Sequence, residues 1–253
     1  MAKRCLKAAV LVLLILIAWQ LAFLSGRWSA YVLPGPRKVL NSFLTMAKSG
    51  VLIKHIAVSL RRVAVGYVIA FCLAFVLGTL ASLREDLTDY YGPTLEFMRN
   101  VPPISLIALL ILWFGIGETS KIIIIVLASF FPMFLNIKKG MLSCDRKLLE
   151  VGKAYGLTVR GRFFRIILPS AVPDILVGMR IGLGYSWRAI IGAEMIAAGS
   201  GLGYLILDSQ QMSRSDKVIV GIIVIGLVGI ACDKVFSLLM KKLVHGGENH
   251  SWS

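Results

Sequence analysis

The chain has 253 residues, of which 57% are hydrophobic and 16% charged, and its mean hydropathy is +0.81. A single soluble core of that length cannot bury so much apolar surface, so the composition excludes a water-soluble globular protein and indicates a polytopic membrane protein. The formal net charge of +15 does not indicate nucleic-acid binding, because no basic soluble domain with base-stacking aromatic residues is present. In a membrane protein, this charge fits cytoplasmic loops and contact with anionic lipid or an acidic partner surface.

The first predicted element is a membrane-spanning helix over residues 6–24. Basic residues precede its apolar run, as they do in a secretory signal peptide. The run is longer than the apolar region of such peptides, however, and Arg27 and Trp28 follow it. We therefore expect a retained helix and not a cleaved leader.

Residues 25–62 are predicted to form a loop on the outer side of the membrane. A Pro-Gly-Pro turn leads into a stretch in which Val39, Leu40, Phe43 and Leu44 recur at helical spacing, with lysines on the other faces. Such a helix is amphipathic. We expect it to lie along the membrane surface instead of crossing it.

Six apolar segments come close to the roughly 20 residues that a helix needs to cross the hydrocarbon core of a bilayer. An even number of spans places both termini on one side. If that side is the cytoplasm, the inside segments hold the larger share of Lys and Arg, as the positive-inside rule requires. The predicted spans are residues 6–24, 63–83, 101–116, 122–137, 175–198 and 218–240.

The third and fourth predicted spans are short and contain prolines. Pro102 and Pro103 open one of them, and Pro132 lies inside the other. Because proline removes a backbone hydrogen-bond donor, other helices or water must satisfy the freed carbonyl groups. We expect both spans to face the protein interior, beside a transport path or a helix interface, and a simple packing kink is the alternative.

The loop 138–173 is polar and strongly basic, and its sequence predicts two short helices joined at Gly156. Ser143 or Asp145 can cap the first helix, Gly156 can end it in the left-handed conformation, and Thr158 can start the second. A surface helix with a basic face offers a binding site for a partner protein. An ordinary positive-inside loop is the alternative, which explains the charge but not the spacing of the residues.

The fifth predicted span contains the ionisable residues Arg180, Arg188 and Glu194. A charge near the middle of a bilayer is costly, so each should face a water-filled path or an opposite charge. Arg188 and Glu194 are six residues apart and point to different sides of a helix, so they do not pair with each other. Either Arg188 lines the passage and favours anions, or these charges tie neighbouring helices together. Glycines at 178, 182 and 184 predict close helix packing.

Catalytic motifs are absent from the sequence. No G-x-x-x-x-G-K-[ST] phosphate-binding loop occurs, and residues 117–121 do not satisfy its spacing. The histidines His55, His245 and His250 do not form a metal-binding set, and there is no G-x-S-x-G motif. We therefore expect a non-catalytic subunit that binds no metal or cofactor of its own.

The chain shows no internal repeat, linker or low-complexity tract, which predicts one domain. We divide it into a first helix with its outer amphipathic segment (1–62), a core containing the basic loop (63–243) and a cytoplasmic tail (244–253).

Within the basic loop, residues 150–169 read EVGKAYGLTVRGRFFRIILP. Their spacing resembles the EAA loop of ATP-binding-cassette (ABC) importer permeases, which reads Glu-Ala-Ala, three residues, Gly, nine residues, Ile-x-Leu-Pro. Val151 and Gly152 replace the two alanines, so we expect a weaker first helix, because Gly inside a helix costs roughly 1 kcal/mol relative to Ala. The residues in register are Glu150, Gly156, Ile166, Leu168 and Pro169.

The resemblance covers nearly the whole chain, from about residue 33 to 243. Segments that resemble the nitrate/sulfonate/taurine branch of these permeases are WFGIGETSK (113–121), FFPMFLNIKKG (130–140), ILPSAVPDILVGMRIGLGYSW (167–187), GAEMI (192–196) and GLGYLI (201–206). The resemblance implies an all-α integral membrane protein of the type I importer (MetI-like) fold, in a bacterial inner or plasma membrane. It also implies a second permease copy, an extracytoplasmic solute-binding protein, and two cytoplasmic ATPase subunits that bind ATP and Mg.

Two sets of site residues follow. The resemblance implies that the loop docks in a groove on the ATPase, with Gly156 as a close-approach turn and Leu157 as an apolar contact. The expected coupling residues are Glu150, Gly156, Leu157, Thr158, Ile166, Leu168 and Pro169. The expected translocation-pathway residues are Pro102, Pro103, Trp187, Arg188 and Glu194.

The expected function is the permease subunit of an ATP-driven importer for a small anion such as a sulfonate, taurine or nitrate. The same machinery importing a pyrimidine precursor of thiamine is an alternative. An ion-gradient-driven secondary transporter is a second one, but it usually shows inverted repeats, and none is visible here. A membrane-embedded enzyme would need convergent His, Asp or Cys residues that the sequence does not supply.

Overall fold

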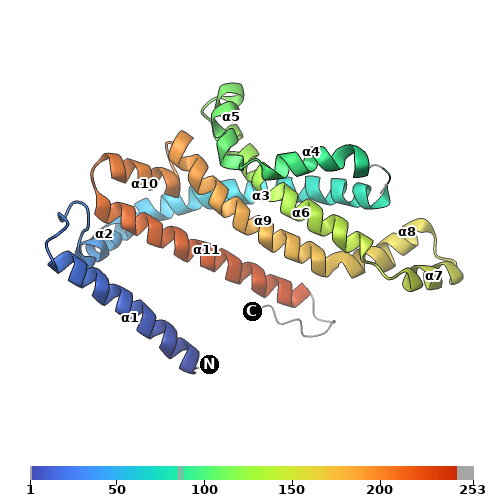
Figure 1. Ribbon diagram of the computed structural model, residues 1–253, viewed down its shortest axis with the longest axis horizontal. Helices are drawn as coiled ribbons and strands as arrows, with labels where there is room; N and C mark the ends of the chain where they lie inside the picture. Colours follow the sequence, from blue (N-terminus) through green and yellow to red (C-terminus); the bar gives the residue numbers. More distant parts are fainter. Residues whose placement is uncertain (1, 85, 87, 244–253) are drawn as a thin grey trace.

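The computed structural model describes residues 2–84, 86 and 88–243, and every regular element in this part of the chain is helical (Figure 1). The tail 244–253, with His245 and His250, lies outside the described residues. The elements are α1 (Ala2–Leu24), α2 (Pro36–Lys48), α3 (Val51–Leu83), α4 (Thr88–Asn100), η2 (Pro103–Leu106), α5 (Ile107–Phe114), α6 (Glu118–Leu142), α7 (Arg146–Ala154), α8 (Val159–Arg162), η3 (Phe163–Ile167), α9 (Leu168–Ala197), α10 (Leu202–Gln211) and α11 (Ser215–Leu243).

The described helices confirm an all-α membrane protein with about six spans. Four helical segments are long and apolar enough to cross a bilayer: α3, α6, the run that ends with α9, and α11. The bent pair formed by α4 and η2–α5 is a fifth crossing if it counts as one span, and a re-entrant loop is the other arrangement that its length and composition allow. Helix α1 contributes a shorter apolar stretch over Val10–Leu24. Figure 1 places α7 and α8 at one end of the molecule and α2 and α10 at the other.

Helix α6 is the centre of the fold, packed between α3 and α9. Glycines allow these backbones to approach: a methyl group added to Gly66 would lie 2.7 Å from Ile125, and one added to Gly182 would lie 2.6 Å from Met133. Gly178 likewise lies against α6, so close packing at 178 and 182 is confirmed. At Gly184 the prediction is wrong, because the nearest atom is Nη2 of Arg188 at 3.9 Å.

Helix α3 corrects the predicted start of the second span. Gly50, with φ +75°, separates α2 from α3, and the chain then stays helical from Val51 to Leu83, across the expected boundary at residue 63. The predicted surface helix is therefore limited to α2. Arg62 does not end the membrane helix, because its guanidinium group is buried against two carboxylates and its charge is compensated.

The third predicted span is also corrected. Residues 101–116 do not form one straight crossing, because α5 has eight residues and is only about 12 Å long. It forms with α4 a pair bent by 87° at residues 101–102. Pro102 and Pro103 explain the bend, because neither can donate a backbone hydrogen bond to continue α4.

The fourth predicted span begins earlier than expected, since α6 starts at Glu118. Pro132 lies inside this helix and faces α9, where a methyl group added to Gly178 would stand 3.2 Å from the Pro132 carbonyl oxygen. A helix interface is therefore confirmed for Pro132. Pro102 is exposed and Pro103 half-buried in this chain.

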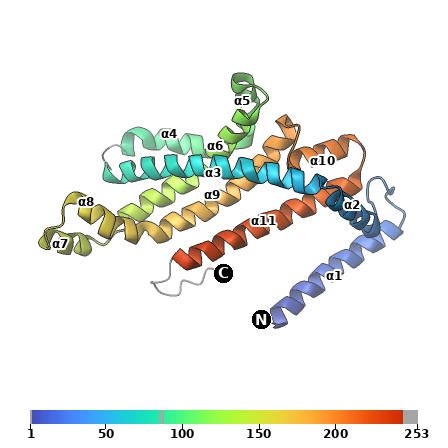
Figure 2. The ribbon, with the colours of Figure 1, turned by 180° about the vertical axis from the view of Figure 1, so that it is seen from behind.

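Helix α1 stands apart from the rest of the chain (Figure 2). Its contacts are mainly with α2 and the turn before it, where Trp19 Nε1 donates a hydrogen bond to the Pro34 carbonyl at 3.1 Å. Most of the apolar side chains over residues 10–24 are exposed, among them Leu11 and Ile15. Such a surface requires lipid or another protein around it.

Candidate functional site

The segment 145–169, which we name the elbow, contains α7, α8 and η3 at one end of the molecule. Asp145 caps α7 by accepting a hydrogen bond from Lys147 N at 2.9 Å. Ser143, the alternative cap, instead donates to the Lys139 carbonyl. Thr158 caps α8 by accepting from Gly161 N at 3.1 Å. The predicted pair of short helices is therefore confirmed, with Asp145 as the first cap.

Gly156 ends α7 in the left-handed conformation, with φ +72°. Gly156 N donates to the Lys153 carbonyl and Leu157 N donates to the Gly152 carbonyl, each at 2.9 Å. These two bonds form a Schellman motif, which satisfies carbonyl groups left open at the end of a helix. No other atom lies within 4 Å of the place where a side chain on Gly156 would begin, so the turn needs glycine for its backbone angle and not for space.

The inner side of the elbow is packed around Gly152. A methyl group there would stand 2.6 Å from Cδ1 of Ile166, and Leu157 Cδ1 would lie at 3.5 Å. The Ile166 side chain thus occupies the space that an alanine would fill, which explains the glycine at position 152. The weaker first helix stays a prediction. Two expected coupling residues, Leu157 and Ile166, are half-buried inside the elbow.

The outer side of the elbow is apolar, basic and open to solvent. Tyr155 is 83% exposed, Val159 72% and Phe164 63%. The sequence interpretation missed Tyr155 and Val159, although apolar residues on both sides of the turn glycine are a usable signal. A hollow of about 650 Å³ on this segment is lined by Leu148, Val151, Gly152, Tyr155, Leu157, Arg165, Ile166 and Ser170.

The remaining expected coupling residues lie on α7 and at the start of α9. Glu150 is exposed on α7. Leu168, which is half-buried, begins α9, and Pro169 is exposed at the next position, where a helix tolerates proline. The structure therefore brings the expected coupling residues into one compact segment, and their contact with an ATPase stays a prediction.

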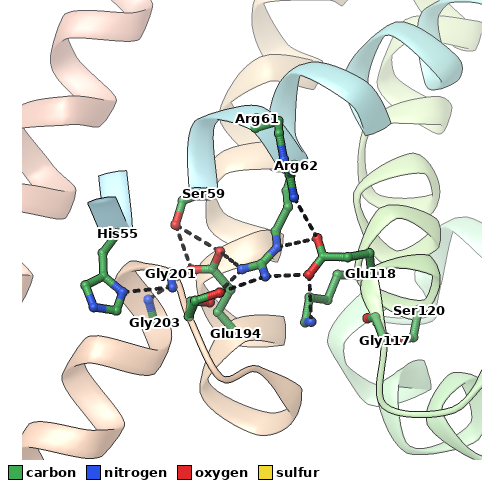
Figure 3. A network of polar contacts seen from close by, with 12 residues as sticks. His55, Ser59, Arg61, Arg62, Gly117, Glu118, Ser120, Glu194, Gly201 and Gly203 are labelled. Atoms are coloured by element: carbon green, nitrogen blue, oxygen red, sulfur yellow. Dashed lines mark hydrogen bonds and ion pairs between the residues drawn. The ribbon is translucent and has the colours of Figure 1, made fainter. Parts of the chain in front are cut away.

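A second polar site lies toward the opposite end, where Arg62 of α3 joins α6 and α9 (Figure 3). Its guanidinium group donates to Glu118 through Nε at 2.8 Å and Nη2 at 2.6 Å. Nη1 donates to Glu194 Oε1 at 2.7 Å and to the Ser200 carbonyl at 2.6 Å. Lys121 adds an ion pair with Glu118 at 3.3 Å. We name these residues with Ser59 the Arg62 cluster.

Glu194 is fully buried in the Arg62 cluster and holds the start of α10. Gly203 N donates to Glu194 Oε2 at 3.0 Å, Leu202 N donates to Ser59 Oγ at 2.9 Å, and Ser59 Oγ donates to Glu194. Gly201 N donates to His55 Nδ1 at 3.0 Å. Three successive amides at the start of α10 are thus satisfied by side chains from α3 and α9.

Glycine is required where α10 meets Glu194. A methyl group on Gly201, whose φ is +115°, would stand 2.2 Å from the Glu194 carboxylate. One on Gly203 would stand 2.2 Å from the Ile191 carbonyl oxygen. The GLG sequence therefore allows the α10 backbone to close over the buried acid.

Two of the three ionisable residues predicted within the fifth span, Arg180 and Glu194, pair with a charge on another helix. Arg180 pairs with Asp233 of α11 through two hydrogen bonds, both 2.8 Å long. Glu194 pairs with Arg62, so the interpretation that the charges tie neighbouring helices together is confirmed for Glu194 and not for Arg188. Arg180 meets an opposite charge, as expected, and Arg188 and Glu194 do not pair with each other. Sequence reasoning missed Arg62, since the partner carboxylates are 56 and 132 residues away.

Arg188 is exposed, and its Cζ lies 5.7 Å from the centre of the Tyr185 ring. Among the residues that the structure describes, no carboxylate lies within ion-pair distance of it. Trp187, another expected pathway residue, packs against α11 and donates from Nε1 to the Ile225 carbonyl at 3.2 Å. Glu194 faces the interior of this chain. The pathway roles of these residues stay predictions.

A polar hollow of about 380 Å³ lies at the α2 and α10 end of the molecule. Asp216 of α11 joins this region by accepting hydrogen bonds from Ser42 and from Arg214, whose Nη2 is 2.9 Å away. The hydrogen bonds with this carboxylate raise the pKa of the Arg214 guanidinium group. The charged lining residues are Lys38, Asp208, Arg214, Asp216 and Lys217, and His55 also lines the hollow.

Comparison with known proteins identifies relatives over most of the chain. Residues 66–245 match the family described as "Binding-protein-dependent transport system inner membrane component". The putative aliphatic sulfonates transport permease protein SsuC of Bacillus subtilis is 36% identical over 94% of this chain and 87% of its own length. SsuC of Escherichia coli is 39% identical over 89% and 86%, and the taurine transport system permease protein TauC of E. coli is 33% identical over 95% and 90%.

A solved structure shares the fold. The crystal structure of an amino acid ABC transporter with histidines superposes with a TM-score of 0.62 and 17% sequence identity. The match covers 79% of this chain and 96% of that one.

Proposed function

This chain belongs to the family of binding-protein-dependent transport system inner membrane components, and from that premise we propose that it is the permease subunit of an ATP-driven importer. Its homologues are transport permeases, so the chain is a multi-pass membrane protein of the ABC transporter type. The observation that carries the importer proposal is the elbow, a preformed, basic and apolar surface at one end of the bundle.

The proposed partner of the elbow is a cytoplasmic ABC ATPase, with one ATPase subunit on each permease copy. No phosphate-binding loop occurs in this sequence, so ATP and Mg would be bound by the partner chains. Tyr155, Val159 and Phe164 offer apolar area at the tip of the elbow, and basic residues surround it. A rigid, capped elbow transmits the closure of the ATPases because packed interfaces shift between discrete arrangements.

The proposed assembly contains a second copy of this chain. Helix α5 projects from the body in Figures 1 and 2, and Leu112, Trp113 and Ile116 at its end are 64–79% exposed. Over residues 10–24, helix α1 is also largely uncovered. A second permease would bury these surfaces and enclose a pathway between the two copies.

The proposed orientation places the elbow and both termini in the cytoplasm of a bacterial cell, with α2 and α10 on the outer side of its inner membrane. The polar hollow beside α2 would then face an extracytoplasmic solute-binding protein. The proposed solute is a small anion such as a sulfonate, taurine or nitrate, because the relatives are named for aliphatic sulfonates and taurine.

The proposal is tested by reconstituting the chain with its ATPase and binding protein in proteoliposomes. ATP-dependent uptake of radiolabelled taurine or an alkanesulfonate is expected, with none when the ATPase is omitted. Uptake without any ATPase would contradict an ATP-driven importer.

The elbow is tested separately by Tyr155→Asp, with Tyr155→Phe as the matched control. We expect the acidic variant to lose co-purification with the ATPase while the chain remains folded, because a charge replaces an exposed aromatic contact. Equal co-purification of both variants would show that the ATPase docks elsewhere.

A further inference from the structure

Arg188 stands out because it is the exception among the charged residues of α9. Arg180 and Glu194 each have an opposite charge on another helix, at 2.8 Å and 2.7 Å. Arg188 has no such partner among the described residues. Within the part of the chain that the structure describes, the Arg188 guanidinium group is therefore left without a counter-charge.

Arg188 lies within the apolar helical segment that is long enough to cross a bilayer and ends with α9. It is about 30 Å along α9 from Leu168 and about 13 Å from Ala197. Ile181, Tyr185 and Ile196 are exposed on the same side of the helix. An unpaired charge in the hydrocarbon core is strongly disfavoured, so this side of α9 must face water or protein.

The local geometry leaves the guanidinium group free to bind. The guanidinium group lies over the Tyr185 ring, and the neighbouring Gly184 has no side chain that could cover it. None of the described residues accepts a hydrogen bond from it. One turn further on, Ile104 of η2 packs against Gly192, which places the bent α4–α5 pair next to this face. Arg188 and the projecting α5 thus border the same uncovered side of the molecule.

We propose that Arg188, supported by Tyr185, is the anion-binding residue of the translocation pathway, and that its ligand is the sulfonate group of the solute. The proposal rests on the proposed importer function. A planar guanidinium group donates two parallel hydrogen bonds to oxyanions, which suits the three oxygens and single charge of a sulfonate. In a symmetric pair of permeases, each copy contributes one such residue to the passage.

The test uses the reconstituted complex of permease, ATPase and binding protein. Arg188→Gln is expected to lower the rate of alkanesulfonate uptake at least tenfold, and Arg188→Lys to restore part of it. The matched control is Arg61→Gln, because Arg61 is exposed on α3 with only a 3.8 Å ion pair to Glu118. ATP hydrolysis stimulated by the loaded binding protein should persist in all variants, since the elbow is unchanged.

A second variant separates a role in binding the alkanesulfonate from a role in the contact between permease copies. Tyr185→Leu removes the aromatic support while leaving the charge, and it should raise the alkanesulfonate concentration for half-maximal uptake several-fold. Unchanged uptake in Arg188→Gln, or loss of its dimer on size-exclusion chromatography, would overturn the proposal, the latter by assigning Arg188 to the contact between copies. If the wild-type complex transports no solute with ATP, the importer function itself has failed.

Discussion

The Arg62 cluster and the elbow use polar and charged residues in opposite ways. In the cluster, the guanidinium donors of Arg62 meet carboxylate or serine oxygens within the same chain, and its side chain is 3% exposed. In the elbow, the backbone is capped internally but Tyr155 and Val159 project outward. The comparison teaches that the cluster finds its partners within one chain and serves the fold, whereas the elbow leaves apolar side chains open to the partner proposed above.

The largest effect is expected from Arg62→Met. The substitution leaves the Glu194 carboxylate buried without its cation, and removing one member of a buried pair typically costs about 3–5 kcal/mol. Thermal unfolding of the purified chain in mild detergent measures the loss. Arg61→Met is the control, since Arg61 is exposed and its ion pair is worth at most about 1 kcal/mol. Equal stability of the two variants would remove the structural role of the cluster.

A double variant sharpens the first prediction. Adding Glu194→Gln to Arg62→Met should recover part of the lost stability, because a neutral buried amide is less costly than an unpaired carboxylate. No recovery would mean that Glu118, and not Glu194, is the important partner of Arg62.

Gly203→Ala is expected to have the next largest effect. Its methyl group would overlap the Ile191 carbonyl, a backbone atom, so α10 must move away from Glu194 at a cost of about 1–3 kcal/mol. Thermal unfolding in detergent again reports the loss. Gly226→Ala on α11 is the matched control, because no atom lies within 4 Å of its added methyl group, and it should be neutral or slightly stabilising.

Gly156→Ala tests the elbow and should act on coupling. Holding alanine at φ +72° costs roughly 1–2 kcal/mol, so the turn after α7 should shift. We expect weaker ATPase binding and slower ATP-dependent uptake with an unchanged midpoint of thermal unfolding. Gly161→Ala, whose methyl group would make an ordinary 3.4 Å contact with Thr158, is the control. A lowered midpoint in Gly156→Ala would make the elbow part of the stabilising core.

Thr158→Ala is expected to have the smallest effect. It removes the side chain that caps α8, which typically costs about 1 kcal/mol and should raise amide hydrogen exchange of Gly161 about fivefold. Thr158→Ser keeps the hydroxyl group and should exchange like the wild type. If both variants exchange equally, the cap does not stabilise the elbow.

The elbow could be predicted from the sequence because its determinants are local. Asp145 and Thr158 cap helices through residues two and three positions away, and Gly156 sets its own backbone angle. The Arg62 cluster could not be predicted, since it depends on contacts between helices distant in sequence. From hydropathy alone, Arg62 is the last residue of the predicted outer loop. Only the folded chain shows that its charge is paired with Glu118 and Glu194.

The bend between α4 and α5 escaped prediction for another reason. Apolar composition identifies a stretch that prefers lipid, but it does not give the direction of the helix axis. Residues 101–116 therefore suggested a straight crossing. Pro102 and Pro103 changed the direction of the chain by 87°. The prolines indicate a break in the hydrogen bonding of the helix, but the angle of the bend depends on how α5 packs in the folded chain.

The order in which Arg62 acquires its two acids has a consequence for biogenesis. At about 5–20 residues per second, a ribosome makes Glu118 roughly 3–11 s after Arg62, and Glu194 roughly 7–26 s after it. Until Glu194 is made, Glu118 is the carboxylate of the cluster that the nascent chain can offer to Arg62. Glu194 is made later as part of α9, so the Arg62 cluster can be completed only after most of the chain has been synthesised.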